Sequence, residues 1–234
     1  MGRQKKIKNA FNDNNLQLQD IAPLTDNQGV FFDNYASDKS QLLLGYSGTG
    51  KTFMACHQAF KEVMKGGDYK RVVIVRSAVP TRDIGFLKGT EDEKGAVYEL
   101  PYVKVCSELF HRDDAYGVLK KHDGIQFMLT SFIRGLTIDN SIIIVDEFQN
   151  MTAHEADSVL TRVGYNSKIM FCGDVLQRDF TKHSEKNIEK FLSVVEGMPH
   201  RFDFNYFDAD DVVRSGLVGD YIKTKHTKYP KGFE

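Results

Sequence analysis

One eight-residue segment limits the possible folds of this chain more than any other feature: Gly45-Tyr46-Ser47-Gly48-Thr49-Gly50-Lys51-Thr52. It matches the pattern G-x-x-x-x-G-K-S/T at every fixed position, and this pattern forms a phosphate-binding loop between a strand and a helix. Glycines let successive backbone N–H groups point at phosphate oxygens. The helix that follows directs its positive dipole end at the same anion. The segment therefore predicts an α/β domain that binds a nucleoside triphosphate.

The same motif predicts a role for its polar residues. Lys51 would bring a mobile positive charge to the β- and γ-phosphates, and Thr52 would offer its hydroxyl to Mg²⁺. ATP, or a close relative, and Mg²⁺ are therefore the expected cofactors. The predicted nucleotide-binding residues of the loop are Ser47, Gly48, Thr49, Gly50, Lys51 and Thr52.

Two carboxylates follow the apolar run Ile142-Ile143-Ile144-Val145. Asp146 is placed to bind Mg²⁺ through water. Glu147 is placed to orient and deprotonate the attacking water. A second acid beside the metal ligand favours hydrolysis over transfer to a substrate hydroxyl, so a small-molecule kinase is the weaker alternative.

A polar segment, Gly173-Asp174-Val175-Leu176-Gln177, follows the next apolar run. We predict that Gln177 contacts the γ-phosphate and reports whether it is present. A surface glutamine with no such role is the alternative.

Short apolar runs alternate with helical patterns along the chain, which is typical of a mostly parallel central sheet flanked by helices. Strands are predicted at 41–44, 71–76, 126–129, 141–146 and 168–172, and an edge strand, with an antiparallel direction considered, at 201–207. Helices are predicted at 52–64, 102–119 and 153–162, the last with Thr152 as N-cap and Glu155 in the capping-box position. Residues 80–100 are predicted to form a long loop.

The chain is predicted to hold a single domain at residues 21–220. A flexible polar arm at 1–20 precedes this domain, and a lysine-rich tail at 221–234 follows it. The charge of 31 basic against 32 acidic residues lacks the excess expected of a strongly nucleic-acid-binding domain. The three cysteines are scattered, and no signal peptide or membrane-spanning run is present, so a cytoplasmic protein without a membrane partner is expected.

Together these residues resemble the PhoH family, ATPases related to the nucleotide-binding half of superfamily-one helicases. The resemblance implies a single RecA-like lobe, and it implies that Gln28, ahead of the phosphate loop, reads the adenine. Further similar segments lie at 76–80, 85–89, 133–137, 145–150, 160–164 and 211–214. The chain departs from the family pattern at Ser77, Phe148, Leu176 and Ser215-Gly216, none of which removes a charge from the phosphate site. The length suits a minimal form, such as a phage-encoded one acting in the host cytoplasm.

The resemblance also implies a partner. A helicase motor closes ATP between two lobes, and the second lobe supplies an arginine to the γ-phosphate. With one phosphate loop, this chain would need that arginine from a neighbouring copy, and head-to-tail contacts that close give rings. We therefore predict a homo-oligomer, a hexamer by resemblance, with Arg162 or Arg214 as the arginine supplied in trans. Either arginine can equally be a surface or salt-bridged residue.

The leading hypothesis is an ATPase that acts on RNA or single-stranded DNA. Lysines and aromatic residues alternate in the tail and could contact phosphates and bases, although a solvated terminus is the alternative: Tyr221, Lys223, Lys225, Lys228, Tyr229, Lys231 and Phe233. Arg76, Arg82 and Arg134 could face a ring opening or a nucleic-acid strand. A second hypothesis is a nucleotide-gated binding module, in which ATP sets assembly and hydrolysis is incidental.

Overall fold

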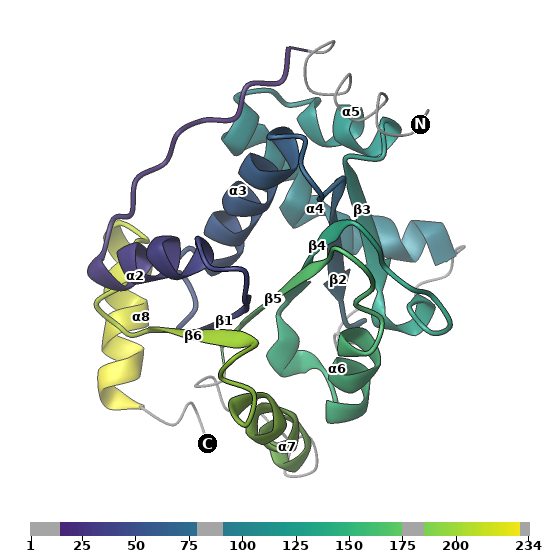
Figure 1. Cartoon of the computed structure of the whole chain (residues 1–234). Helices are drawn as coiled ribbons and strands as arrows, with labels where there is room; N and C mark the ends of the chain where they lie inside the picture. Colours follow the sequence, from purple (N-terminus) through teal and green to yellow (C-terminus); the bar gives the residue numbers. More distant parts are fainter. Residues whose placement is uncertain (1–14, 79–90, 175–184, 230–234) are drawn as a thin grey trace.

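Six strands form one sheet in this computed structural model, which describes residues 15–78, 91–174 and 185–229 (Figure 1). In the order β3-β2-β4-β5-β1-β6, every neighbouring pair in the sheet is parallel. The strands are β1 Ser40–Gly45, β2 Arg71–Arg76, β3 Ile125–Leu129, β4 Ser141–Asp146, β5 Lys168–Gly173 and β6 Phe202–Phe207. Because all six run the same way, their carboxyl ends meet at one edge of the sheet. The phosphate loop and the acidic pair both lie at that edge.

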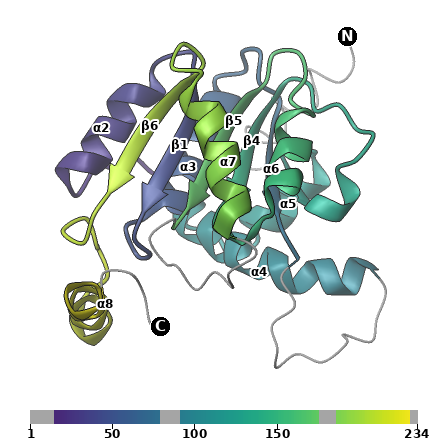
Figure 2. The same cartoon turned by 90° about the horizontal axis from the view of Figure 1, so that it is seen from below.

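The inner strands are buried on both faces, as their continuous apolar runs predict. Leu42, Ile74 and Ile144, one from each of β1, β2 and β4, are all fully buried. Helices cover the two faces of the sheet (Figures 1 and 2). One face packs against α2 Asp26–Tyr35, α3 Lys51–Met64, α4 Glu91–Phe110 and α5 Ala115–Lys121, and the other against α6 Ala153–Leu160 and α7 Glu185–Glu196.

Most of the predicted elements are present. The predicted strands match β1 to β5 within a residue or two, α3 begins at Lys51, and Thr152 and Glu155 form the predicted capping box of α6. The helix predicted at 102–119 is two helices, α4 and α5. The chain turns between them at His111, whose φ is +49°. Within the loop predicted at 80–100, residues 91–100 already belong to α4, and 80–90 lie outside the described residues.

The sixth strand lies at the edge, as predicted, but the antiparallel direction is wrong. β6 pairs with β1 in parallel along its whole length, from Ser40 against Phe202 to Gly45 against Phe207. The chain leaves β5 at the carboxyl ends of the strands and returns through α7 to their amino ends before β6 begins. A connection of this kind makes the next strand parallel.

The two ends of the predicted domain differ from the expectation. A helix, α8 Gly216–Lys228, crosses the boundary expected at 220 and covers most of the lysine-rich tail. In the predicted arm, residues 1–14 lie outside the described part, whereas Leu16 is buried and Gln19 N donates to Leu109 O. None of the helices within the described ranges is long and apolar enough to span a membrane.

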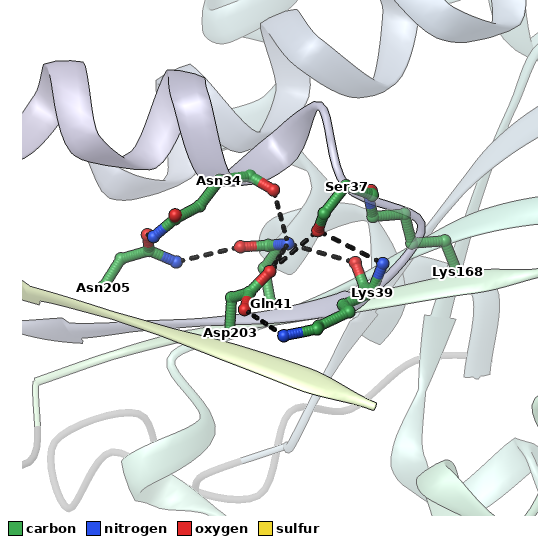
Figure 3. Close-up of polar contacts among 7 residues, drawn as sticks. All are labelled: Asn34, Ser37, Lys39, Gln41, Lys168, Asp203 and Asn205. Carbon is green, nitrogen blue, oxygen red and sulfur yellow. Dashed lines mark hydrogen bonds and ion pairs between the residues drawn. The ribbon is translucent and has the colours of Figure 1, made fainter. Parts of the chain in front are cut away.

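A buried polar cluster joins α2 to the amino ends of β1, β5 and β6 (Figure 3). Asn205 Nδ2 donates to Gln41 Oε1 at 3.0 Å, and Asn34 Nδ2 donates to Asn205 Oδ1 at 2.8 Å. Lys168 Nζ donates to the carbonyl oxygens of Tyr35 and Ser37, at the end of α2. These bonds satisfy polar groups that burial would otherwise penalise, and they fix α2 against the sheet.

Candidate active site

Three glycines of the phosphate loop, Gly45, Gly48 and Gly50, have positive φ. Gly45 ends β1 with φ at +146°, and a Cβ there would lie 1.9 Å from the carbonyl oxygen of Phe207 in β6. Gly50 precedes α3 with φ at +82° in the left-handed region, which other residues adopt at a cost. No side chain caps the start of α3. The loop therefore curls tightly and presents the uncapped N-terminus of α3, which favours an anion.

The Lys51 ammonium is held inside this loop. Its Nζ donates to Gly45 O at 2.8 Å, to Tyr46 O at 2.5 Å and to Thr49 Oγ1 at 3.2 Å. Burial lowers the pKa of Lys51, and the negative charge of Asp174 opposes that shift. A buried cation surrounded by dipoles of its own loop is placed to meet phosphate oxygens.

Thr52 and Asp146 lie together although they are far apart in the sequence. Thr52 Oγ1 donates to Asp146 Oδ1 at 2.7 Å, and Asp146 is only 5% exposed. A hydroxyl and a carboxylate are the oxygen ligands that Mg²⁺ prefers, usually with several waters and substrate phosphates. Within the described residues, no group of three His, Cys, Asp or Glu side chains could hold a metal alone. These two residues therefore fit Mg²⁺ that is brought with a nucleotide.

Glu147 follows β4 in a strained backbone conformation. Its φ of +51° and ψ of +40° are left-handed, and a non-glycine residue there is held by its surroundings, often at a functional site. Gln149 Nε2 donates to Glu147 Oε2 at 2.5 Å. Burial raises the pKa of Glu147, and the neighbouring Asp146 raises it further. A carboxylate with a raised pKa is a stronger base toward water.

Gln149 is a site residue that the sequence analysis did not single out. Its Oε1 accepts from Asp174 N at 3.0 Å, and Asp174 Oδ2 accepts from Ser47 N at 2.9 Å. Gln149 thus connects Glu147 to the phosphate loop through Asp174. The signals in the sequence were the position of Gln149 just after the acidic pair and its place in the family-like segment 145–150.

Gln28 braces the phosphate loop from α2. Its Nε2 donates to Thr49 O at 3.1 Å, and its Oε1 accepts from Leu24 N at 2.7 Å. Nearby, Asp211 accepts from Thr25 Oγ1 and from Asn27 Nδ2. Adenine reading by Gln28 remains a prediction, and its observed contacts place it against the loop.

The two candidate arginines lie near opposite ends of the strands, Arg214 at the carboxyl ends and Arg162 at the amino ends. A Cβ at Gly48 would lie 3.1 Å from Arg214 Cγ, so Arg214 lies against its own phosphate loop. Arg162 O accepts from Ile138 N, three residues before β4 begins, whereas the acidic pair follows the other end of β4. Arg162 Nε is buried without a hydrogen-bond partner among the described residues.

The remaining predicted residues are two arginines near the sheet, the tail residues and a set outside the described part of the chain. Arg76 ends β2 beside Asp146, and Arg134 is exposed in the loop after β3. In α8, the ring of His226 packs at a tilt against Tyr46 of the phosphate loop with ring centroids 3.6 Å apart, so this part of the predicted tail packs on the site. The predicted residues Arg82, Leu176, Gln177, Lys231 and Phe233 lie outside the described residues.

A family model described as PhoH-like protein matches residues 20–225. A protein named PhoH2 from Bacillus subtilis is 38% identical over 141 residues, covering 58% of this chain and 32% of that protein. A PhoH-like protein from the same organism is 30% identical over 181 residues, covering 77% and 56%. A PhoH-like protein from Synechocystis is 32% identical over 179 residues, covering 75% and 53%. The chain thus spans about half, or less, of the length of these relatives.

Solved structures show a distant likeness. The Sulfolobus solfataricus SWI2/SNF2 ATPase core in complex with dsDNA aligns with a TM-score of 0.46 at 12% identity, covering 81% of this chain and 47% of that one. A large terminase from a thermophilic bacteriophage aligns with a TM-score of 0.43 at 11% identity, covering 94% and 48%.

Proposed function

Because this chain belongs to the PhoH family and carries the phosphate loop of a P-loop NTPase, we propose that it is a Mg²⁺-dependent ATP hydrolase. The observation that carries this proposal is the 2.7 Å hydrogen bond between Thr52 and Asp146. It joins the phosphate loop to the acidic strand at the carboxyl edge of the sheet, where Lys51 and Glu147 also lie. A hydroxyl, a carboxylate, a buried ammonium and a second carboxylate are the groups that ATP hydrolysis needs.

Each group has a distinct task in this reaction. Lys51 binds the β- and γ-phosphate oxygens. Thr52 and Asp146 would hold Mg²⁺, and the ion would neutralise charge on those oxygens. Glu147 accepts a proton from water as the water oxygen bonds to the γ-phosphorus. The bond from that phosphorus to the bridging oxygen breaks, and ADP leaves with the electron pair. Gln149 keeps Glu147 oriented during this step.

We also propose that the ATPase acts on RNA or single-stranded DNA that crosses the carboxyl edge of the sheet. Phe132, at the end of the short 3-10 helix that follows β3, is 46% exposed there, and Arg134 is exposed two residues later. Tyr221 of α8 is 57% exposed and is followed by the exposed Lys223. Aromatic rings that stack on bases, beside cations that contact phosphates, are the usual means of binding single strands.

The third part of the proposal is a ring of copies in which Arg162 acts in trans. Asp146 lies five positions after Ser141 in β4, a rise of about 16 Å at roughly 3.3 Å per residue. Arg162 lies beyond the far end of that strand and cannot reach its own site. Arg162 is half-buried, and in the proposed ring its guanidinium group would act in the site of a neighbouring copy. Arg214, which lies on its own phosphate loop, is suited to act in cis.

The test is release of free phosphate from ATP by the wild type and by Glu147→Gln, with and without single-stranded RNA. We expect Glu147→Gln to reduce release at least about 100-fold, because general base catalysis typically contributes that much. The matched control is Glu99→Gln, whose carboxylate contacts Tyr116 and Lys120 away from the phosphate loop. This control is expected to keep wild-type release.

The outcomes separate the parts of the proposal. Acceleration by RNA supports action on nucleic acid. Release that RNA does not change leaves the hydrolase intact and favours nucleotide-gated assembly. Transfer of phosphate to a small molecule would favour a kinase, and absence of release from the wild type with Mg²⁺ would overturn the proposal.

A further inference from the structure

Tyr102, in α4, has the largest fully buried side chain in the described part of the chain. Its ring packs beside Phe127 of β3, with ring centroids 5.8 Å apart. Phenylalanine would fill the same space, so packing does not explain the hydroxyl. A buried hydroxyl costs free energy unless it finds a partner. The partner here is Asp146, whose Oδ2 accepts from Tyr102 OH at 2.8 Å.

Each carboxylate oxygen of Asp146 accepts a hydrogen bond from a different side chain. Oδ1 accepts from Thr52 of α3 and Oδ2 accepts from Tyr102 of α4. Rotation of the carboxylate about its Cβ–Cγ bond would break both hydrogen bonds. The carboxylate is therefore fixed with Oδ1 toward the phosphate loop and Oδ2 toward the core.

The same face of α4 contacts the neighbouring strand end. Tyr98 lies one helical turn before Tyr102, on the same side of the helix. Its ring lies 5.9 Å from the guanidinium carbon of Arg76, and Arg76 is the register partner of Asp146 in β2. Two tyrosines of α4 thus contact residues at the carboxyl ends of β2 and β4. These contacts position the helix beside Asp146.

We propose that Tyr102 is a positioning residue for the Mg²⁺–nucleotide complex, because its hydroxyl holds Asp146 with one oxygen facing Thr52. This inference rests on the proposed nucleotide site. Tyr102 acts through Asp146 and bonds to its inward oxygen. Outer partners of this kind orient the groups that hold a metal, and their loss typically weakens metal binding or activity 10- to 100-fold.

The test compares Tyr102→Phe with the matched control Tyr116→Phe. Tyr116, in α5, also donates its hydroxyl to a carboxylate, Glu99 Oε2 at 2.8 Å, but that carboxylate is not one of the predicted site residues. A fluorescent ATP analogue is titrated in EDTA and at rising Mg²⁺. For Tyr102→Phe we expect the Mg²⁺ concentration that gives half of the affinity gain to rise about 10-fold. Affinity in EDTA should stay within about twofold, and the control should behave as the wild type.

The Asp146→Asn background shows whether Tyr102 acts through Asp146. In that background, adding Tyr102→Phe is expected to shift the Mg²⁺ midpoint by less than about twofold, because coupled residues are not additive. An equal shift in both backgrounds would mean that Tyr102 acts by packing and would overturn the inference. Melting temperatures measured without nucleotide show whether each variant is folded. A less stable variant does not spoil the comparison, because a packing defect would shift the Mg²⁺ midpoint equally in both backgrounds.

Failure of the inference and failure of the proposed function give different results. A wild-type protein whose nucleotide affinity does not respond to Mg²⁺ would contradict the proposed function. A wild type that responds, together with a Tyr102→Phe protein that responds at the same Mg²⁺ concentration, would overturn the inference alone.

Discussion

At the scale of single residues, the site depends on side chains that hold other side chains. Glu147 is the proposed base, and its strained backbone and half-buried carboxylate are maintained by neighbours. Gln149 supports Glu147 with one end of its amide and Asp174 with the other. Asp174 in turn accepts from Ser47 N through its own carboxylate, so Gln149 contacts the base directly and the phosphate loop only through Asp174.

We predict that Gln149→Leu lowers the rate of phosphate release about 10-fold, a part of the 10²- to 10⁴-fold that general base catalysis contributes. The variant keeps the side-chain volume and removes both hydrogen bonds. Nucleotide affinity should change less than about twofold, since Lys51 and the loop backbone bind the phosphates. Single-turnover rates and binding titrations measure the two effects.

The control for this prediction is Gln126→Leu in β3, where the glutamine is only half-buried. It should behave as the wild type in both assays. If Gln149→Leu instead weakened nucleotide binding and left the rate unchanged, its main role would be to brace the phosphate loop through Asp174.

At the scale of elements, α2 is held at both ends. Gln28 fastens its first turn to the phosphate loop, and Lys168 holds its last turn to β5 (Figure 3). Lys168 is buried, donates to two carbonyl oxygens and lies 4.1 Å from the ring centroid of Tyr35. Burial lowers the pKa of Lys168 to about 8, against the partial compensation of Glu62, Asp38 and Asp203.

This pKa predicts how the contribution of Lys168 to stability depends on pH. The folded pKa of about 8 lies below the value of about 10.4 for an unfolded lysine. Between these values the unfolded chain binds more protons, so stability rises with pH. The difference in unfolding free energy between the wild type and Lys168→Met should therefore grow from about pH 7.5 to about pH 9.5 in urea titrations. An equal difference at both values would contradict a depressed pKa.

The sequence predicted the elements that follow local rules and missed those decided by distant packing. The phosphate loop, the capping box of α6 and the apolar strands carry their signals within a few residues, so periodicity and motif spacing sufficed. The direction of β6 depends on where α7 returns the chain, which no local pattern states. Residues 216–228 show weak periodicity, and their helix is stabilised by contacts of Ile222 and His226 with the phosphate loop.

The same division holds within the site. Lys51, Thr52 and Asp146 were predicted because their motifs are defined by spacing. The contact of Tyr102 with Asp146 could not be predicted, because it joins residues 44 positions apart through the packing of α4. Nothing in the sequence indicated that Lys168 is buried, because a lysine at the start of a strand is normally exposed.

At the scale of the whole molecule, Arg162 and Arg214 are separated by about the length of a strand. A site at the carboxyl ends of the strands and an arginine, Arg162, beyond their amino ends suit head-to-tail contacts between copies, which close into rings. In the proposed ring, this geometry favours Arg162 over Arg214 as the arginine that acts in trans. We therefore predict that Arg162→Ala lowers phosphate release by about 10³-fold or more, the usual contribution of such an arginine.

Mixing two inactive variants distinguishes an arginine in trans from one in cis. Arg162→Ala copies keep the base, and Glu147→Gln copies keep the arginine. A productive contact needs the site of the first beside the arginine of the second, and in a random one-to-one ring each contact meets this condition with a probability of about 1/2 × 1/2. The mixture should therefore recover about a quarter of wild-type phosphate release, although neither variant alone is active. If Arg162 acted within its own chain, no mixture would recover activity, because no copy would hold both residues.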